Sequence, residues 1–166
     1  FSTMGINTGK WYCEIKTNDS TSDFYLALID SGLLKVTTGS TALQSAVNSL
    51  YWYSANGNLY RDGASENLTS GLGYIQTQDV VGLEIDFDAV IPTFSFYKNG
   101  ELACTRDLAG TLQTLISKGG HILIGYAVTT TWPNVNMTFN FGQGDPDGEN
   151  NFTDSRGKGG FRYEPS

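Results

Sequence analysis

Apolar and polar residues alternate along several short stretches of this chain. In residues 10–16, the apolar side chains of Trp11, Cys13 and Ile15 fall on one side of an extended backbone. Residues 79–88 alternate in the same way over a longer stretch. Because successive side chains of a strand point to opposite faces, a repeat of two predicts strands with one buried face.

Further strands are predicted wherever a short apolar run lies between turn residues. Asn56-Gly57 and Asn99-Gly100 are hairpin signals, since a type I′ turn needs two residues that tolerate positive φ. Residues 33–50 favour a loop with one helical turn, and no stretch shows the pattern of a long amphipathic helix. The whole pattern predicts an all-β sandwich or barrel. The remaining expected strands are 24–29, 50–54, 58–61, 93–98, 101–105, 121–127 and 135–141.

The same alternation predicts the core and a change of character near the C-terminus. Residues 143–166 are rich in Gly, Asp and Asn, so we expect a linker or C-terminal tail after a sandwich domain over residues 1–142, with 161–166 as a docked end. The chain begins at Phe1 rather than Met, and we expect a piece of a larger protein. The residues expected to be largely buried are Trp11, Leu83, Ile85, Phe94, Phe96, Ile122, Ile124, Phe139 and Phe141.

Composition excludes several classes of function. The 166 residues carry a net charge of −7 and no basic run, which argues against a nucleic-acid partner. No apolar run approaches the ~20 residues of a membrane span. No phosphate-binding loop or dinucleotide fingerprint occurs, so no cofactor is expected. Cys13 and Cys104 belong to no CxxC pair, which disfavours zinc; they are expected as small buried side chains, with a disulfide as the alternative.

Catalytic and metal chemistry find little support in the sequence. His121 is the single histidine and has no nucleophile motif near it. A glycosidase needs a pair of carboxylates, and neighbours two apart among Glu84, Asp86 and Asp88 share one face of a strand. The alternation places this face opposite the apolar one, where the carboxylates would meet solvent or cap turns. The acidic stretch 145–150 misses the spacing of a calcium loop and is expected to be solvated. We therefore expect no enzyme and no metal site.

Six segments in order resemble the SPRY (B30.2-type) family, over roughly residues 5–142. They are TGKWYCEI, LYRDG, QDVVGLEIDFD, FSFYKNGEL, HILIGYAV and MTFNFG. The resemblance implies a two-sheet antiparallel β-sandwich of the SPRY/concanavalin-like type, working as a non-catalytic protein- or peptide-binding module. The family's first strands have no counterpart here, and residues 33–50 do not align. NFGQG with GKGGFRYEPS resembles the continuation in SPRY-containing phage structural proteins, which implies a place in a virion, as a tail, fibre or capsid-associated protein.

Aromatic residues near the Asn56-Gly57 hairpin are the candidate binding residues. The cluster around this hairpin, with Asn56 in its turn, consists of Tyr51, Trp52, Tyr53, Tyr60 and Arg61, of which Trp52 or Tyr53 is expected in the core. Trp132 lies in another loop. Tyr, Trp and Arg dominate binding hot spots because they bury much area and keep polar groups. The family resemblance implies that Tyr60 and Trp132 line the partner site.

These candidates lead to a prediction about their arrangement and their partner. We expect Tyr60, Arg61 and Trp132 to form one exposed patch, although Trp132 could instead cover the end of the sandwich. The expected partner is a protein or peptide. The alternative is a surface glycan, bound by a lectin-like module for host attachment, because aromatic loops suit sugar rings as well.

Overall fold

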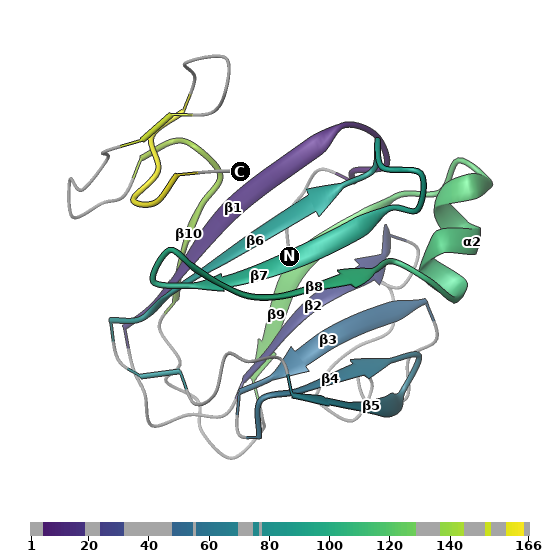
Figure 1. Ribbon diagram of the computed structural model, residues 1–166, viewed down its shortest axis with the longest axis horizontal. Coiled ribbons are helices and arrows are strands. Elements are labelled where there is room, and N and C mark those ends of the chain that lie inside the picture. The colour runs from purple at the N-terminus through teal and green to yellow at the C-terminus, as the bar shows by residue number, and fades with distance from the viewer. Residues whose placement is uncertain are drawn as a thin grey trace.

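The computed structural model describes ten strands and one short helix (Figure 1). The described residues are 5–18, 24–31, 48–54, 56–69, 75–76, 78–128, 137–144, 152–153 and 159–164, of which 65–69 and 126–128 are described by their backbone alone. The elements are β1 (Lys10–Thr17), β2 (Phe24–Asp30), β3 (Ser49–Tyr53), β4 (Asn58–Arg61), β5 (Ala64–Thr69), β6 (Val80–Asp86), β7 (Thr93–Lys98), β8 (Glu101–Asp107), α2 (Thr111–Ser117), β9 (Ile122–Val128) and β10 (Met137–Asn140).

Two five-stranded sheets build the fold. The first has the order β10-β1-β6-β7-β8 and the second the order β5-β4-β3-β2-β9. All the neighbouring strands pair antiparallel. Figure 1 shows the sheets as two layers, with α2 at one end and the β7–β8 hairpin at the other. The predicted two-sheet antiparallel sandwich is confirmed.

The main core lies between the sheets and consists of the alternate apolar residues of both. Six of the expected core residues are buried there: Leu83, Ile85, Phe94, Phe96, Ile122 and Ile124. Trp52 adds the largest buried side chain, and its ring packs edge-on against that of Phe24 at a centroid distance of 5.5 Å. Burying large aromatic and aliphatic side chains is the dominant favourable term in folding, so this layer stabilises the sandwich.

Two of the expected core residues are exposed. Trp11 is 38% exposed, and its indole Nε1 donates a hydrogen bond to the carbonyl of Thr8 at 2.7 Å. Phe141 is 46% exposed, follows the last residue of β10 and stacks on the half-buried ring of Phe139 at 6.0 Å. Both predictions were wrong. Trp11 is the second residue of β1, and Phe141 lies beyond the end of β10, so alternation within the strands does not tell whether these side chains are covered.

Turn geometry departs from the sequence prediction at one hairpin and matches it at another. Asn99 and Gly100 both have positive φ, 51° and 85°, as a type I′ turn requires. Strands β3 and β4 pair as expected, but of Asn56-Gly57 only the glycine has positive φ, 69°. The amide of Gly57 donates to the carbonyl of Tyr53 at 2.9 Å, so this connection is longer than a two-residue turn.

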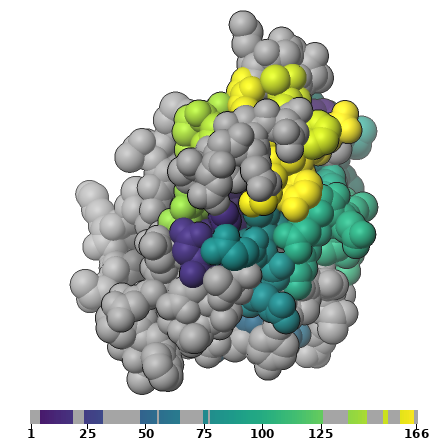
Figure 2. Space-filling model, turned by 90° about the vertical axis from the view of Figure 1, so that its left-hand side faces the viewer, coloured from purple at the N-terminus to yellow at the C-terminus, as the bar shows by residue number. Residues whose placement is uncertain are grey.

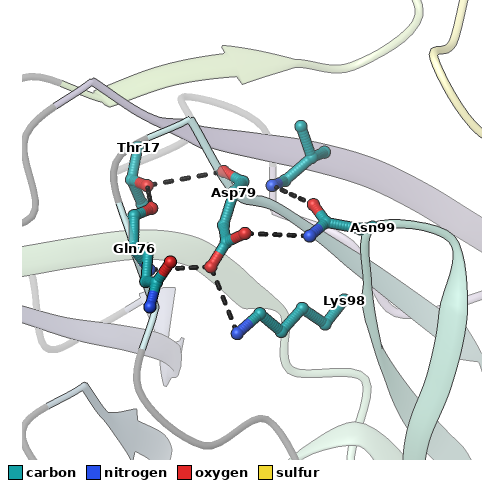
Figure 3. A network of polar contacts seen from close by, with 6 residues as sticks. Thr17, Gln76, Asp79, Lys98 and Asn99 are labelled. Carbon is teal, nitrogen blue, oxygen red and sulfur yellow. Dashed lines mark hydrogen bonds and ion pairs between the residues drawn. The ribbon is translucent and has the colours of Figure 1, made fainter.

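A polar network fixes the β7–β8 hairpin to the chain that enters β6 (Figure 3). The Asp79 carboxylate accepts hydrogen bonds from the amide of Gln76 at 2.7 Å and from Asn99 Nδ2 at 2.8 Å. It also pairs with Lys98 Nζ at 3.2 Å. Burial opposes ionisation of Asp79, but these donors outweigh it and hold the pKa of the carboxyl below its usual range. The network therefore depends on the negative charge of Asp79.

The sequence analysis missed two elements and expected a third that the structure does not test. Strand β5 has no apolar alternation, and α2 is a seven-residue helix with a single buried residue, Leu112. Both elements lie in stretches rich in turn and loop residues, where the alternation of apolar and polar positions is weak. The helical turn expected within 33–50 falls mostly outside the described residues.

Candidate binding surface

Four tyrosines line the face of the second sheet that points away from the main core. We call Tyr25, Tyr51, Tyr53 and Tyr60 the tyrosine face. The register places Tyr25 opposite Tyr53 and Tyr51 opposite Tyr60 on neighbouring strands. Paired residues on one face of a sheet bring their side chains into contact. Here the repeat of two in β2, β3 and β4 puts every one of these rings on the same side.

The rings of the tyrosine face pack on one another in a continuous row. Tyr53 stacks on Tyr25 with centroids 4.5 Å apart, and Tyr51 stacks on Tyr60 at 4.9 Å. Between the two pairs, Tyr25 and Tyr51 meet edge-on at 5.4 Å. Aromatic pairs in these geometries add about 0.5–1.5 kcal/mol each beyond their burial. The row is therefore a rigid support.

Only the two ends of this row reach the surface. Tyr25 and Tyr51 are 1% and 2% exposed, whereas Tyr53 and Tyr60 are half-buried. Burial, with Tyr25 and Tyr60 beside it, raises the pKa of the Tyr51 hydroxyl to about 12. Tyr51 is thus a neutral supporting ring, while Tyr53 and Tyr60 are partly exposed.

Asn56 holds the hydroxyl of Tyr60 in place. Its Nδ2 donates a hydrogen bond to the Tyr60 hydroxyl at 3.0 Å, and its Oδ1 accepts one from the amide of Asn58 at 2.9 Å. Asn56 itself is exposed. The structure thus brings together three residues that sequence analysis proposed: Tyr51 below, Tyr60 at the surface and Asn56 beside its hydroxyl.

Arg61 lies on the other face of β4. It pairs in register with Leu50, which belongs to the main core, and its Nη2 donates to the carbonyl of Asp107 at 3.1 Å. The expectation that Tyr60 and Arg61 share one patch is therefore corrected, because neighbouring residues of a strand point to opposite faces. Trp132, the third expected member of that patch, lies outside the described residues.

The Asp-Gly pair that follows Arg61 makes structural contacts. Asp62 and Gly63 both have positive φ, 50° and 79°, and form the tight turn between β4 and β5. The Asp62 carboxylate accepts hydrogen bonds from the amide of Ser49 at 3.3 Å and from the hydroxyl of Thr111 at the start of α2. In the LYRDG segment, the tyrosine thus belongs to the surface, whereas the arginine and aspartate tie the sheet to β8 and α2.

The carboxylates that the sequence offers for a glycosidase pair make contacts within turns and between strands. Asp86 accepts hydrogen bonds from the amides of Asp88 and Ala89 at 2.9 and 3.1 Å and pairs with Lys10 at 2.8 Å. Glu84 accepts one from the Tyr97 hydroxyl at 3.0 Å. These positions agree with the expected exposed or turn-capping face.

The histidine and the two cysteines were the other candidates for chemistry in the sequence. His121 is exposed, and Cys13 and Cys104 are buried free thiols. Within the described ranges, no three His, Cys, Asp or Glu side chains gather as a metal site, and no helix is long and apolar enough to cross a membrane. The acidic stretch 145–150 lies outside those ranges.

Tyr25 is the member of the tyrosine face that sequence analysis did not group with the hairpin residues. The signal was available in part, because Tyr25, Ala27 and Ile29 alternate in β2 and all three belong to the cluster under the tyrosine face. Their relation to Tyr51 and Tyr60 depends on the order of strands in the sheet. That order is a property of the whole fold.

Comparisons with known proteins show the fold of this chain. No protein-family model and no curated protein sequence matches the chain. Among solved structures, the SPRY domain of human HERC1 matches with a TM-score of 0.61 and 16% identity, over 83% of this chain and 78% of that one. The TRIM65 PSpry domain matches with a TM-score of 0.53 and 12% identity, over 82% of this chain and 64% of that one. The chain therefore has a SPRY-like fold.

Proposed function

We propose that this chain is a protein- or peptide-binding module that grips its partner at the exposed end of the tyrosine face. One observation carries the proposal. Tyr60 is half-buried at the surface, its ring rests on Tyr51, and its hydroxyl is held by Asn56. A partner that contacts Tyr60 does not have to order it first, so little conformational entropy is lost on binding.

The chemistry of Tyr60 suits a protein partner. A tyrosine offers a large apolar ring with a polar tip, and such residues concentrate binding energy when they sit in a packed setting. Tyr53, at the other end of the row, gives a second ring of the same kind. The SPRY-like fold supports this assignment by analogy alone, since one fold hosts many functions.

We further propose that the module is not catalytic. Two carboxylates of β6 are engaged in turn and strand contacts: Asp86 accepts from the amides of Asp88 and Ala89, and Glu84 from the hydroxyl of Tyr97. Catalysis needs a nucleophile or a base held within hydrogen-bond reach of its partner group. Turnover of a glycoside, ester or phosphate substrate that disappears in Asp86→Asn or His121→Ala would refute this part.

Selection from a random peptide library displayed on yeast tests the binding site. The immobilised full chain should enrich peptides whose binding weakens by about 1–2 kcal/mol or more, roughly 5- to 30-fold, in Tyr60→Ala. Leu102→Ala is the matched control, because Leu102 is an exposed apolar residue of the other sheet and its loss should leave binding unchanged. Enriched peptides that bind both variants like the original chain would refute the assignment.

A glycan array separates this function from the lectin-like alternative. If the chain binds sugars strongly, fails to enrich peptides, and loses the sugar with Tyr60→Ala or Trp132→Ala, it is a carbohydrate-binding module. The peptide proposal then fails. A protein-binding module gives no strong sugar signal.

A virion setting is proposed from the C-terminal sequence alone. NFGQG with GKGGFRYEPS resembles the continuation in SPRY-containing phage structural proteins. Mass spectrometry of purified virus particles from the source material should find peptides of this chain at structural-protein levels. Their absence from particles, with presence in the surrounding cell extract, would contradict this setting.

A further inference from the structure

The connection between β6 and β7 presents two apolar side chains to solvent. We call residues 87–92 the apolar loop. Val90 is fully exposed, at 103%, and Ile91 is 45% exposed. Figure 1 shows this connection at the end of the sandwich that carries α2. Figure 2 views the opposite end, where the yellow C-terminal residues lie against the teal-green atoms of the β7–β8 region. The apolar loop joins strands of the first sheet, whereas the tyrosine face belongs to the second.

The exposed residues of the apolar loop are unusual for a turn. Turn positions favour Gly, Pro, Asn, Asp and Ser, and this chain uses such pairs at Asp62-Gly63 and Asn99-Gly100. Between Asp88 and Pro92, the apolar loop instead has the sequence Ala-Val-Ile. Because Val90 stays fully in solvent, it contributes no buried area to the fold. Contiguous exposed apolar side chains of this kind mark surfaces that another molecule buries.

Hydrogen bonds fix the apolar loop on the side of β1. The amide of Phe87 donates to the carbonyl of Gly9 at 3.0 Å, and the amide of Gly9 donates to Asp88 Oδ1 at 3.2 Å. Asp86 Oδ1 accepts from the amide of Asp88 at 2.9 Å and from that of Ala89 at 3.1 Å. The first half of the loop is therefore held both by the neighbouring strand and by its own turn.

The side of β8 is fixed as well. The carbonyl of Pro92 accepts a hydrogen bond from the amide of Leu108 at 2.7 Å, and the ring of Pro92 restricts its own φ. Val90 and Ile91 are β-branched, so each has few χ1 rotamers to lose. A partner that buries these two side chains therefore orders little that is not already ordered, which lowers the entropic cost of binding.

Acidic side chains flank the apolar loop. Asp88 within it and Asp107, which pairs with Thr93 just after it, are both exposed. Asp86 adds a third negative charge, but Lys10 pairs with it at 2.8 Å. The whole chain carries a net charge of −7. A complementary surface would carry basic groups, because opposite potentials across an interface favour association and like charges oppose it.

We propose that the apolar loop is a second docking element, which inserts Val90 and Ile91 into an apolar pocket of a partner protein whose rim carries lysine or arginine. A membrane fits these observations poorly, since a lipid surface is held by a large apolar face with basic residues around it. A second copy docked loop to loop would bring Asp88 and Asp107 of both copies together, and their charges would repel.

Selection from a yeast-displayed library of randomised helical miniproteins, which can form pockets, tests this docking element. The full chain is the target, without counter-selection, and each enriched clone is measured against single variants. One group of clones should bind Val90→Ser at least about 10-fold more weakly than the original chain and be unaffected by Tyr60→Ala. Clones directed to the tyrosine face show the reverse, so the two sites succeed or fail separately.

Leu102→Ser is the matched control, because Leu102 is 59% exposed in the same sheet. Val90-dependent clones should bind it like the original chain and should carry an excess of apolar and basic residues. Changing their Lys and Arg to Glu should weaken binding at least about 10-fold. The proposal is overturned if no clone depends on Val90, if as many clones depend on Leu102, or if the charge change has no effect.

Three further measurements exclude other roles for Val90. The midpoint of urea unfolding should be the same for Val90→Ser and the original chain, and a lower midpoint would assign Val90 to the fold instead. Vesicles of phosphatidylcholine, alone or with phosphatidylserine, should not sediment the chain. Sedimentation velocity should show no dimer that Val90→Ser removes. Vesicle binding or a dimer that is lost with Val90→Ser would overturn the assignment to a partner protein.

Discussion

The Asp79 network gives the sharpest prediction about stability, because its contribution depends on pH. Asp79→Asn keeps the size of the side chain and one acceptor oxygen but removes the charge. The Asp79 side chain is 14% exposed, and three donors meet it: the Gln76 amide, Asn99 Nδ2 and Lys98 Nζ. Since hydrogen bonds to a charged group are worth about 1.5–3 kcal/mol each and one acceptor survives, the variant should lose roughly 1–3 kcal/mol at pH 7.

Acid should erase this difference. Because the pKa of Asp79 is lower in the folded protein than in the unfolded chain, its charge stabilises the fold above the ordinary carboxyl pKa of about 4. That contribution is lost as the pH falls through the lower pKa of the folded state. Urea unfolding followed by tryptophan fluorescence at pH 7, 5, 4 and 3 measures it. The original chain should lose more stability on acidification than Asp79→Asn, and an equal penalty at pH 7 and pH 3 would refute the role of charge.

Three further predictions concern single side chains. Trp52→Ala should cost about 3–5 kcal/mol of stability because Trp52 is fully buried, whereas Trp11→Ala, at an exposed position, should cost less than about 1 kcal/mol; thermal melts compare the two. The pKa of Tyr51 is raised from 10 to about 12 in the folded protein, so the neutral hydroxyl makes its full contribution to the free energy of unfolding below pH 10. That contribution should fall by about 2–3 kcal/mol as the pH rises to 12. In urea titrations, Tyr51→Phe should remove this part of the fall. Arg61→Ala should lower stability by about 1–3 kcal/mol through its lost bond to the Asp107 carbonyl and leave peptide binding unchanged in the library assay.

The strands could be predicted because local alternation is a direct consequence of strand geometry. The extents of β4 and β7 match the expected ranges residue for residue, and the others shift by a few positions. The type I′ prediction succeeded at Asn99-Gly100, where the turn is two residues long, and failed at Asn56-Gly57, where the connection is longer. The dipeptide specifies a turn, but the strand register decides its length.

The outer face of β1 shows what a local pattern cannot contain. Tyr12, Glu14 and Lys16 read as the solvent side of a half-buried strand, yet Glu14 and Lys16 are buried. For Glu14, part of the cover comes from residues 162–163, whose amides donate to its carboxylate from more than a hundred positions along the chain. From the sequence alone, a polar residue that hydrogen-bonds buried backbone groups cannot be distinguished from a polar residue exposed to water.

The candidate site was predicted in part for the same reason. Tyr51, Asn56 and Tyr60 could be grouped from the sequence because one hairpin carries all three. The placement of Arg61 on the opposite face follows from its position next to Tyr60 in a strand, and sequence alone supports that correction once β4 is accepted. The contribution of Tyr25 could not be predicted, since it requires β2 to lie beside β3 in the sheet.

The most direct test of the central claim compares Tyr60→Phe with Tyr60→Ala against one enriched peptide, by isothermal titration calorimetry. Tyr60→Phe keeps the ring on Tyr51 and loses the hydroxyl held by Asn56, and Tyr60→Ala loses both. Tyr60→Ala should weaken binding by roughly 5- to 30-fold, about 1–2 kcal/mol, with Tyr60→Phe in between and both proteins folded. Affinities for both variants that equal that of the original chain would contradict the account.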